Sequence, residues 1–556
     1  MGTINENEFI EELIFCLNEE DVVKAKALLQ FASDTNINAD IQKKALAELG
    51  RGQATLVFPL LEFLTKLEIK NVEVQEGLYD LILDKAYGNT DRVIEYIGQN
   101  EKPTRMQFIK AAGDLYLKET APTLARVIQT EQDPDIIMRA VISLGVLRSE
   151  ENVDVFSSLT AHPDLSVRKA AIFAIAENNT PKAVDTLLTF LGENEDTNKL
   201  AVEALADMQD LYALEKMTTL LRSSITIVRD TAIDQLMKLG NKATPLLTRA
   251  FKNAESDYLI HLITTLGYIR DPAAISLILD IINTQPKDAN IRQAAYEAME
   301  RIPSPKTAIC LAQGLQDPVE SVRMSAARAI DKNLSKPLVA GLKNIIRQGS
   351  DQSLMTVAAL IDTEAGNIFN FLVEEESFQT LAQKHIIEAA TPATRNTFLK
   401  QMAGIGQKEF ANKILEQSPE KPKTDSTLKI IVVDDSKMML KLYQNKLSAL
   451  GFDSQTFNRP EDAIPEILSQ GANLVITDLN MPNISGLELT CEVRKKFNRK
   501  DLPILMITTQ SDFVEEKSGD VDVNDALLKK SGINQVLHKP FSDDDFKKAI
   551  LKFLTP

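Results

Sequence analysis

Residues 167–191 read VRKAAIFAIAENNTPKAVDTLLTFL, which are two apolar stretches of helical character with a polar break between them. Pro181 directly follows Thr180 in that break. A threonine hydroxyl accepts a hydrogen bond from an unpaired N–H at a helix start, and proline is tolerated in the first turn because it has no N–H to leave unpaired. The stretch therefore predicts the end of one helix and the start of the next.

Polar residues suited to start a helix recur along the chain at intervals of 29 to 33 residues. They are Thr120, Ser149, Thr180, Asp210, Asn241, Asp271 and Ser304. A second and mostly basic series lies 18 to 21 residues after them: Arg139, Arg168, Lys199, Arg229, Leu259, Arg292 and Arg323. Because both series stay in step, we predict a repeated helix pair. One pair cannot cover its own apolar face, so the pairs must stack into an all-α solenoid with one continuous core.

The second helix of each pair carries alanines such as Ala171 and Ala295, which allow neighbouring helices to approach closely. A Val-Arg-x-x-Ala pattern stands there in residues 167–171, 228–232 and 322–326, with Ile for Val in 291–295. This part of the chain resembles HEAT repeats of the short type, most clearly over residues 104–360. We assign residues 1–417 to this solenoid.

Charge is distributed unevenly along the chain. The total is 62 basic against 79 acidic residues, a net charge of −17; residues 428–556 contribute 17 and 19 of these, which leaves a net charge of −15 for residues 1–427. An acidic surface repels phosphate backbones and anionic lipids, so we expect no nucleic-acid binding, and no apolar segment predicts membrane insertion. Cys16, Cys310 and Cys491 are far apart and predict reduced thiols of a cytoplasmic protein.

Residues 418–427 contain two prolines and no large apolar residue, which predicts a linker. After it, β-branched runs alternate with amphipathic stretches, which is typical of a doubly wound α/β fold with a parallel, five-stranded, flavodoxin-like sheet. The strong runs are followed or ended by chemically useful residues, namely Asp434 and Asp435, Asp478, Thr508 and Lys539. Since ligands bind outside the carboxyl ends of parallel strands, these side chains should converge. Carboxylates without His or Cys favour Mg²⁺.

Residues 428–556 resemble a response-regulator receiver domain. The resemblance rests on Asp434-Asp435-Ser436, on residues 477–482 with Gly486 shortly after, on Thr508, and on Lys539-Pro540-Phe541. It implies that Asp478 accepts a phosphoryl group and that Thr508 is the switch hydroxyl, with Lys539 as the phosphoryl counter-ion. It also implies that Asp434, Asp435, Asp478 and the backbone carbonyl of Asn480 bind Mg²⁺, Asp434 through water.

Three features depart from the pattern of that family. Val536 stands where many receivers have a Tyr or Phe that rotates on phosphorylation, and an insertion is predicted within residues 515–525. Thr509 stands where similar receivers often have a smaller residue, which predicts slowed dephosphorylation. The usual relay from the Thr to an aromatic residue is therefore not expected in this chain.

The leading hypothesis is a two-component response regulator that takes its phosphoryl group from a histidine kinase or phosphotransfer protein. Its receiver would catalyse its own phosphorylation and dephosphorylation, without an independent enzyme, and would control which unknown protein the solenoid binds. One alternative is a constitutive solenoid scaffold with the receiver as a phosphate sink. A lyase-type activity in the array is a further alternative, since some short HEAT-type families contain bilin lyases. His162, His261 and His385 look isolated and give it no specific support.

Overall fold

The structure is a computed structural model that describes residues 6–34, 38–98, 101–284, 286–417, 428–470, 472–481, 484–509 and 532–554. The predicted linker, residues 418–427, and the predicted insertion, residues 515–525, lie outside the described residues. The chain divides into two compact units, residues 1–214 and 215–556, and each is described by itself.

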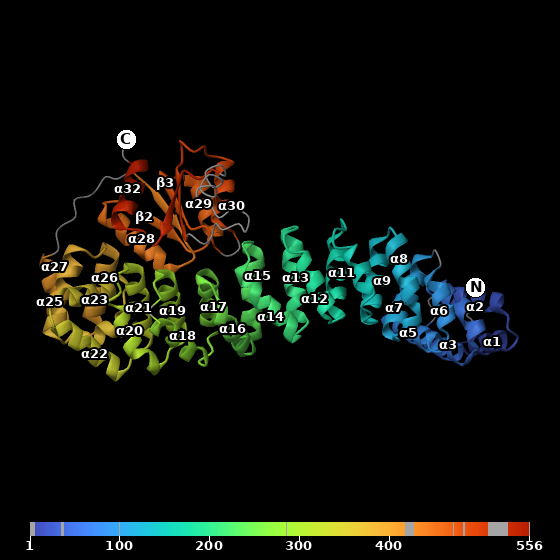
Figure 1. Cartoon of the computed structure of the whole chain (residues 1–556). Helices are drawn as coiled ribbons and strands as arrows, with labels where there is room; N and C mark the ends of the chain where they lie inside the picture. Colours follow the sequence, from blue (N-terminus) through green and yellow to red (C-terminus); the bar gives the residue numbers. More distant parts are fainter. Residues whose placement is uncertain are drawn as a thin grey trace. The chain divides into compact units, whose positions relative to one another are not determined.

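The described residues of the first unit form helices, most of which Figure 1 labels. They are α1 (Glu6–Asn18), α2 (Val22–Asp34), α3 (Ala39–Arg51), α4 (Ala54–Leu64), α5 (Val72–Ala86), α6 (Thr90–Ile97), α7 (Lys102–Asp114), α8 (Ala121–Thr130), α9 (Pro134–Val146), α10 (Asn152–Ser157), α11 (Leu165–Glu177), α12 (Pro181–Thr189), α13 (Glu195–Asp207) and α14 (Leu211–Thr219), which runs into the second unit. A short 3₁₀ helix, Lys118–Thr120, precedes α8.

The second unit continues the helical array and then forms an α/β part. Its array helices are α15 (Thr226–Leu239), α16 (Thr244–Ala250), α17 (Ser256–Ile269), α18 (Ala274–Asn283), α19 (Ala289–Arg301), α20 (Ala308–Gly314), α21 (Glu320–Lys332), α22 (Lys336–Arg347), α23 (Asp351–Asp362), α24 (Gly366–Leu372), α25 (Glu376–Glu388), α26 (Pro392–Gly404) and α27 (Lys408–Gln417). Short 3₁₀ helices lie at Leu220–Arg222, Gly240–Lys242, Phe251–Asn253 and Pro305–Thr307.

The series of predicted helix starts holds in part. Thr180, Asp210, Asp271 and Ser304 each accept a hydrogen bond from a backbone N–H of the turn that follows. Thr120 instead donates to the carbonyl of Leu117, and Ser149 lies before the start of α10 without such a side-chain bond. Asn241 lies inside a 3₁₀ helix. Thr120 still stands directly before α8, as predicted, although its side chain does not cap the helix, whereas Ser149 and Asn241 do not stand at a helix start. A 3₁₀ helix precedes α8 and another precedes α16, and a turn at residues 150–151 precedes α10.

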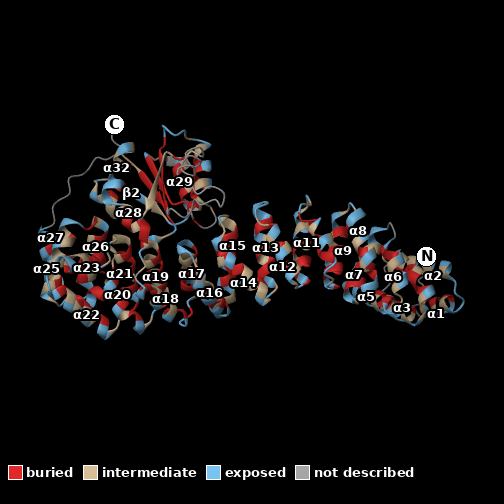
Figure 2. Ribbon diagram, in the orientation of Figure 1, coloured by how far each residue is buried: buried red, intermediate tan, exposed pale blue. Residues whose placement is uncertain are grey.

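Small residues bring the second helices of neighbouring repeats together. A Cβ placed on Gly145 of α9 would lie only 3.0 Å from the Cβ of Ala174 on α11. Ala171 and Ala174 are buried, and α11 contacts both α9 and α13. Figure 2 shows the buried residues along the helix faces that meet inside each stack. The expected role of the alanines in close helix approach is thus visible in the packing.

The α/β part is a five-stranded parallel sheet with the strand order β2-β1-β3-β4-β5. The strands are β1 (Ile430–Val433), β2 (Ser454–Phe457), β3 (Leu474–Thr477), β4 (Ile504–Thr509) and β5 (Gln535–Lys539). The helices described around it are α28 (Lys437–Ala449), α29 (Pro460–Gln470), α30 (Gly486–Arg494) and α32 (Asp543–Leu554). This order is that of a doubly wound, flavodoxin-like sheet, as the sequence predicted.

Alternating residues of β1, an inner strand of the sheet, face two separate cores. Ile430 and Val432 pack in one cluster with residues of α28 and α32, whereas Ile431 and Val433 pack in another with residues of α29 and α30. Both faces of β1 are buried, which explains why its sequence is a continuous apolar run. Within the described ranges, no helix is both long enough and apolar enough to cross a membrane.

Candidate functional site

The strands of the sheet bring the predicted site residues to one edge. Val433 pairs with Thr477 at the ends of β1 and β3, and the backbone N–H of Asp478 donates to the carbonyl of Val433 at 3.0 Å. The first residues after these two strands, Asp434 and Asp478, therefore lie side by side. On the other side of β3, β4 and β5 end at the same edge, which is the crevice side of an open parallel sheet.

Lys539, the last residue of β5, links the two carboxylates. Its Nζ donates to Oδ1 of Asp478 at 2.7 Å and to Oδ2 of Asp434 at 3.1 Å. Asp434 is 1% exposed and Asp478 is 8% exposed. Burial alone would lower the pKa of Lys539, but the two carboxylates outweigh it and hold this pKa well above its ordinary value. Lys539 is therefore a charged ammonium that compensates two buried anions.

The loop after β3 holds the carboxylate of Asp478 in place. Oδ2 of Asp478 accepts a hydrogen bond from the backbone N–H of Asn480 at 3.0 Å. A Cβ on Gly486 would lie 2.0 Å from the carbonyl oxygen of Asp478, so this close approach requires glycine. Ser485 and Glu488 form a capping box at the start of α30, which fixes where the loop ends.

Asp435 and Thr508 complete the predicted set. Thr508 is buried near the end of β4, whereas the side chain of Asp435 is exposed. The pKa of Asp435 is raised, first because surrounding protein atoms desolvate its carboxylate and then because Asp434 and Asp478 repel it, while Lys539 acts in the opposite direction. Solvent screens these interactions at an exposed side chain. The edge carries more negative charge than one ammonium compensates.

Tyr443 of α28 belongs to this site although the sequence analysis did not single it out. Its ring is 1% exposed and lies 6.1 Å from the ring of Phe541 and 6.0 Å from that of Phe546, both measured between centroids. Burial raises the pKa of Tyr443 well above its ordinary value, as do the two buried carboxylates, while Lys539 lowers it. The tyrosine thus forms an apolar wall beside the ammonium. Its place two turns into the helix that follows the acidic pair was the only signal in the sequence.

The donor set at this edge fits Mg²⁺ in its chemistry. It offers carboxylate and backbone carbonyl oxygens, which suit a hard cation that also keeps water ligands. The raised pKa of Asp435 reflects a crowding of anions that a cation would relieve. Among the described residues, no three His, Cys, Asp or Glu side chains are placed to hold a metal ion by themselves. The ligand set predicted from the sequence differs from such a group, since it includes the backbone carbonyl of Asn480 and reaches Asp434 through water.

The departures from the usual receiver pattern lie between the end of β4 and β5. Val536 packs against a small buried cluster that contains Leu479, Met506 and Ile533. No aromatic side chain stands at this position of the strand. The side chain of Thr509 lies outside what the structure describes, as does the predicted insertion in residues 515–525.

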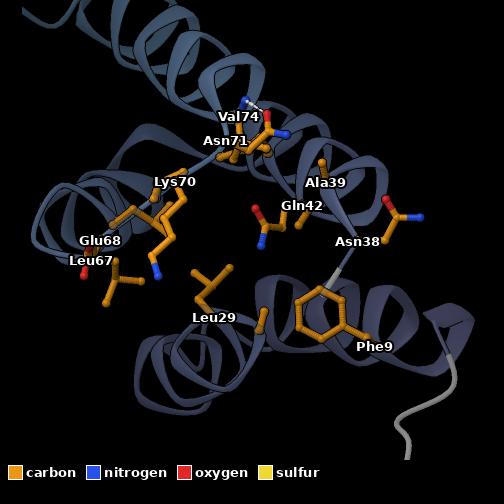
Figure 3. Close-up of a pocket in the computed structure, with 15 residues that line it drawn as sticks. Phe9, Leu29, Asn38, Ala39, Gln42, Leu67, Glu68, Lys70, Asn71 and Val74 are labelled. Atoms are coloured by element: carbon orange, nitrogen blue, oxygen red, sulfur yellow. Dashed lines mark hydrogen bonds between the residues drawn. The ribbon is translucent and has the colours of Figure 1, made fainter. Parts of the chain in front are cut away.

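The helical array contains a pocket of about 260 Å³ among its first helices, shown in Figure 3. Phe9 and Leu29 form part of its apolar lining. Two of its amide side chains serve helix starts, since Asn38 accepts from the N–H of Asp40 and Asn71 accepts from that of Val74. This arrangement adds no observation in favour of a lyase-type activity.

Two of the predicted lone histidines have partners. Nε2 of His385 lies 2.9 Å from Oδ1 of Asp362, so the prediction that His385 is isolated was wrong. Nδ1 of His162 accepts a hydrogen bond from the backbone N–H of Asp164 within its own turn. Both contacts join residues of the array to their neighbours in the same or the next helix pair.

The repeated arginines of the array have a shared structural role. The guanidinium of Arg168 donates to the carbonyls of His162 and Pro163 at 2.8 and 3.1 Å. Arg229, Arg292 and Arg323 make the same contact with a carbonyl six residues earlier. These arginines hold the turn before their own helix.

Comparisons with known proteins agree with this division of the chain. The model of the response regulator receiver domain family matches residues 430–551, and that of HEAT repeats matches residues 130–197, 149–236 and 244–331. Chemotaxis protein CheY1 of Helicobacter pylori is 35% identical over 125 residues, which are 22% of this chain and 94% of that protein. Chemotaxis protein CheY of Pseudomonas aeruginosa is 32% identical over 128 residues, with shares of 22% and 94%.

A solved structure of chemotaxis protein CheY4 of Vibrio cholerae is 28% identical and covers 23% of this chain and 98% of its own, with a TM-score of 0.20. On the sequence comparisons, the chain belongs to the response regulators. Its C-terminal part is a receiver domain, and its N-terminal region carries HEAT repeats.

Proposed function

We propose that Asp478 accepts a phosphoryl group from a phosphohistidine donor protein, and that this event controls which protein the HEAT-repeat array binds. The observation that carries the proposal is the buried contact of the Lys539 ammonium with the carboxylate of Asp478 at 2.7 Å. That ammonium lies where the oxygens of a phosphoryl group on Asp478 need positive charge. The donor would be a histidine kinase or a phosphotransfer protein, as for receiver domains in general.

In the proposed reaction, a carboxylate oxygen of Asp478 attacks the phosphorus atom of the phosphohistidine. The new P–O bond forms as the P–N bond breaks, and the imidazole leaves with the electron pair and takes up a proton. The N–H of Asn480 orients the carboxylate, and Lys539 stabilises the charge on the transferred group. Thr508, buried at the same edge, is the hydroxyl assigned to the phosphoryl group as the switch. Such positioning and charge compensation supply most of the catalysis of phosphoryl transfer.

Mg²⁺ would be held by Asp435, Asp478 and the carbonyl of Asn480, and by Asp434 through water. Bound there, the ion would supply positive charge for the phosphoryl oxygens and relieve the crowding of the carboxylates. Oδ1 of Asp434 accepts a hydrogen bond from the backbone N–H of Ser436 at 2.9 Å, and Oδ2 accepts one from Lys539. These contacts hold Asp434 in place for an indirect role.

The proposal also divides the chain by role. Residues 1–417 would be the binding array, residues 418–427 a linker and residues 428–556 the regulatory receiver, in a protein that works in the cytoplasm. The acidic excess of the first part is then a property of the binding surface. A solenoid offers an extended surface for a protein partner, and a small change in one helix pair alters its curvature.

Phosphorylation tests the first half of the proposal. The full chain, incubated with Mg²⁺ and acetyl phosphate, is expected to take up one phosphoryl group, measured by intact mass. Asp478→Asn should take up none, whereas Asp544→Asn, which changes an exposed carboxylate on α32, should behave as wild type. Uptake by Asp478→Asn equal to that of the wild type would contradict the assignment.

Binding tests the second half. Proteins would first be captured from the native cell with the isolated array. Their affinity for the full chain would then be measured with Mg²⁺ alone and with Mg²⁺ plus beryllofluoride, which mimics an acyl phosphate. A changed affinity is expected under the proposal. Equal affinities would favour the alternative, in which the array is a constitutive scaffold and the receiver a phosphate sink.

A further inference from the structure

Two lysines of α28 form ion pairs with glutamates of the helical array. Nζ of Lys446 lies 2.6 Å from Oε2 of Glu320, the first residue of α21. Nζ of Lys441 lies 2.7 Å from Oε1 of Glu364, in the turn after α23. The lysine side chains are 13% and 21% exposed and the glutamate side chains 38% and 32%, so solvent partly shields these pairs from one side only. Within the second unit, the receiver thus offers basic groups to an acidic array.

An apolar contact lies between the same two helices. Met324 of α21 is 1% exposed and belongs to the same hydrophobic cluster as Met439 and Leu442 of α28. Helices α21 and α28 are in contact in the second unit. Met324 of the array is thus buried in a hydrophobic cluster of the receiver, which adds an apolar contact to the two ion pairs. The flexible side chain of methionine adapts readily to such a contact.

The phosphorylation edge of the receiver faces the array as well. Lys539 and Phe541 line a cavity of about 410 Å³ whose other lining includes Asn290, Gln293 and Arg323. Arg323 is engaged with its own turn, where it donates to the carbonyl of Asp317 at 2.7 Å. Lys539, the counter-ion of the site, thus shares this cavity with residues of the array.

The same cavity brings an acidic residue of the array near the counter-ion of the site. Glu320 of α21 lines it together with Lys539, and Lys539 contacts the carboxylate of Asp478 at 2.7 Å. A charge added at Asp478 therefore lies on the side of the receiver that faces the array.

We infer that the face formed by α19, α21 and the turn after α23 is a docking surface for the receiver of the same chain, and that phosphorylation of Asp478 weakens this docking. The inference rests on the proposed function, and it names the surface through which the receiver controls the array. The occupant is defined by the ion pairs of Lys446 and Lys441 and by the burial of Met324.

The direction follows from the added charge. With Mg²⁺ present in both states, a phosphoryl group on Asp478 adds negative charge beside Lys539, which lines the same cavity as Glu320 of the array. Repulsion across the cavity then opposes the attraction made by α28. Release of the receiver frees the same face of the array for another protein, which links the two events by a shared surface.

A cross-linking experiment tests docking in the full chain. Lys441→Cys and Glu364→Cys are combined with Cys491→Ser, because Cys491 is exposed whereas Cys16 and Cys310 are buried. Brief oxidation with Mg²⁺ alone should form an intramolecular disulfide. Addition of beryllofluoride should lower its yield about fivefold or more, which corresponds to the lower end of ordinary coupling energies.

A matched pair inside the array provides the control. Asp154 and Lys182 form an ion pair of similar length, 3.1 Å, within the first unit. The variant with Asp154→Cys and Lys182→Cys should cross-link equally with and without beryllofluoride. A yield for the Lys441 and Glu364 pair that also stays equal would overturn the inferred coupling, and a disulfide found only between two chains would overturn docking within one chain.

Charge reversal at the second ion pair, Lys446 with Glu320, tests the docking without placing a cysteine in that pair. Added to the cross-linking variant, Glu320→Lys should lower the yield several-fold without beryllofluoride, because the new lysine would face Lys446. Glu215→Lys, which breaks an exposed pair with Arg249 elsewhere in the array, should have no effect. If Glu320→Lys leaves the yield unchanged, the inferred docking surface is wrong.

The two proposals fail in different ways. If acetyl phosphate adds no phosphoryl group to Asp478, the proposed function is wrong. If the phosphoryl group is added and the cross-link yield does not change, the proposed function stands and only the docking inference is wrong.

Discussion

The ammonium of Lys539 lies 2.7 Å from Asp478 and 3.1 Å from Asp434, so a single, mostly shielded cation compensates two buried carboxylates. The stability of this edge and its chemistry therefore depend on the same side chain. A buried ion pair that loses one partner costs far more than an exposed one, because the remaining charge stays desolvated.

Replacing Lys539 by methionine keeps the bulk of the side chain and removes its charge. We expect Lys539→Met to lower the free energy of unfolding of the receiver by about 3 kcal/mol in metal-free buffer, and by less with Mg²⁺. Chemical denaturation with and without Mg²⁺ measures both values. Lys437→Met, at an exposed position of α28, should change stability by less than about 0.5 kcal/mol.

The raised pKa of Asp435 makes stability depend on pH. The folded state binds this proton more tightly than the unfolded state, so the stabilisation is complete below the ordinary pKa of 3.8 and is lost as the pH rises toward the raised value. In metal-free buffer, the stability of wild type minus that of Asp435→Asn should fall as the pH rises from about 4 toward neutrality. Urea denaturation across this range measures the difference, and a difference that rises with pH would contradict the assignment.

Mg²⁺ should reverse this effect. Because the ion binds the ionised carboxylates, we expect it to stabilise the wild-type receiver more at pH 7 than at pH 5, and Asp435→Asn to respond much less. Thermal unfolding with increasing Mg²⁺ at the two pH values checks the expectation. An equal response of both proteins would show that Asp435 does not bind the ion.

Gly486→Ala should disturb the loop that holds Asp478. The new Cβ would lie 2.0 Å from the carbonyl oxygen of Asp478, so the loop must shift, at a cost of about 1–3 kcal/mol. We expect slower uptake of phosphoryl from acetyl phosphate together with lower stability. Gly341→Ala, in the middle of α22 with free space around the new Cβ, should instead stabilise its helix by about 0.5–1 kcal/mol.

Thr509 bears on the lifetime of the phosphorylated state. It pairs in register with Lys539 at the edge of the sheet, where similar receivers often have a smaller residue. We expect Thr509→Ala to speed the loss of the phosphoryl group by about threefold to tenfold, a change of up to about 1.4 kcal/mol in the barrier. Decay of phosphorylated protein after removal of the donor measures this rate, and an unchanged rate would end the hypothesis.

Much of the fold was predictable because its signals are local. The helix pairs follow from the spacing of polar starts and of the Val-Arg-x-x-Ala pattern, and the sheet follows from apolar runs that end in polar residues. Asn241 was assigned wrongly because a preceding 3₁₀ turn takes over the start of the helix, and such turns depend on packing that spacing alone does not reveal.

Only the site residues that lie at or directly after the ends of strands could be predicted from the sequence. Asp434, Asp478 and Lys539 were placed by the rule that parallel strands share a carboxyl edge. Tyr443 was missed because its role depends on the rotation of α28 against the sheet. The contact of Met324 with the receiver was also invisible, since it joins residues more than one hundred positions apart.

The arginine contacts in the turns of the array have a consequence for how such a protein changes length. Arg168, Arg229 and Arg323 each bind a carbonyl only six residues earlier, so the shape of each turn is encoded within its own repeat. Removal of one whole helix pair would join two turns of the same construction. Duplication or deletion can therefore change the number of repeats without any change in the sequence of the turns that connect them.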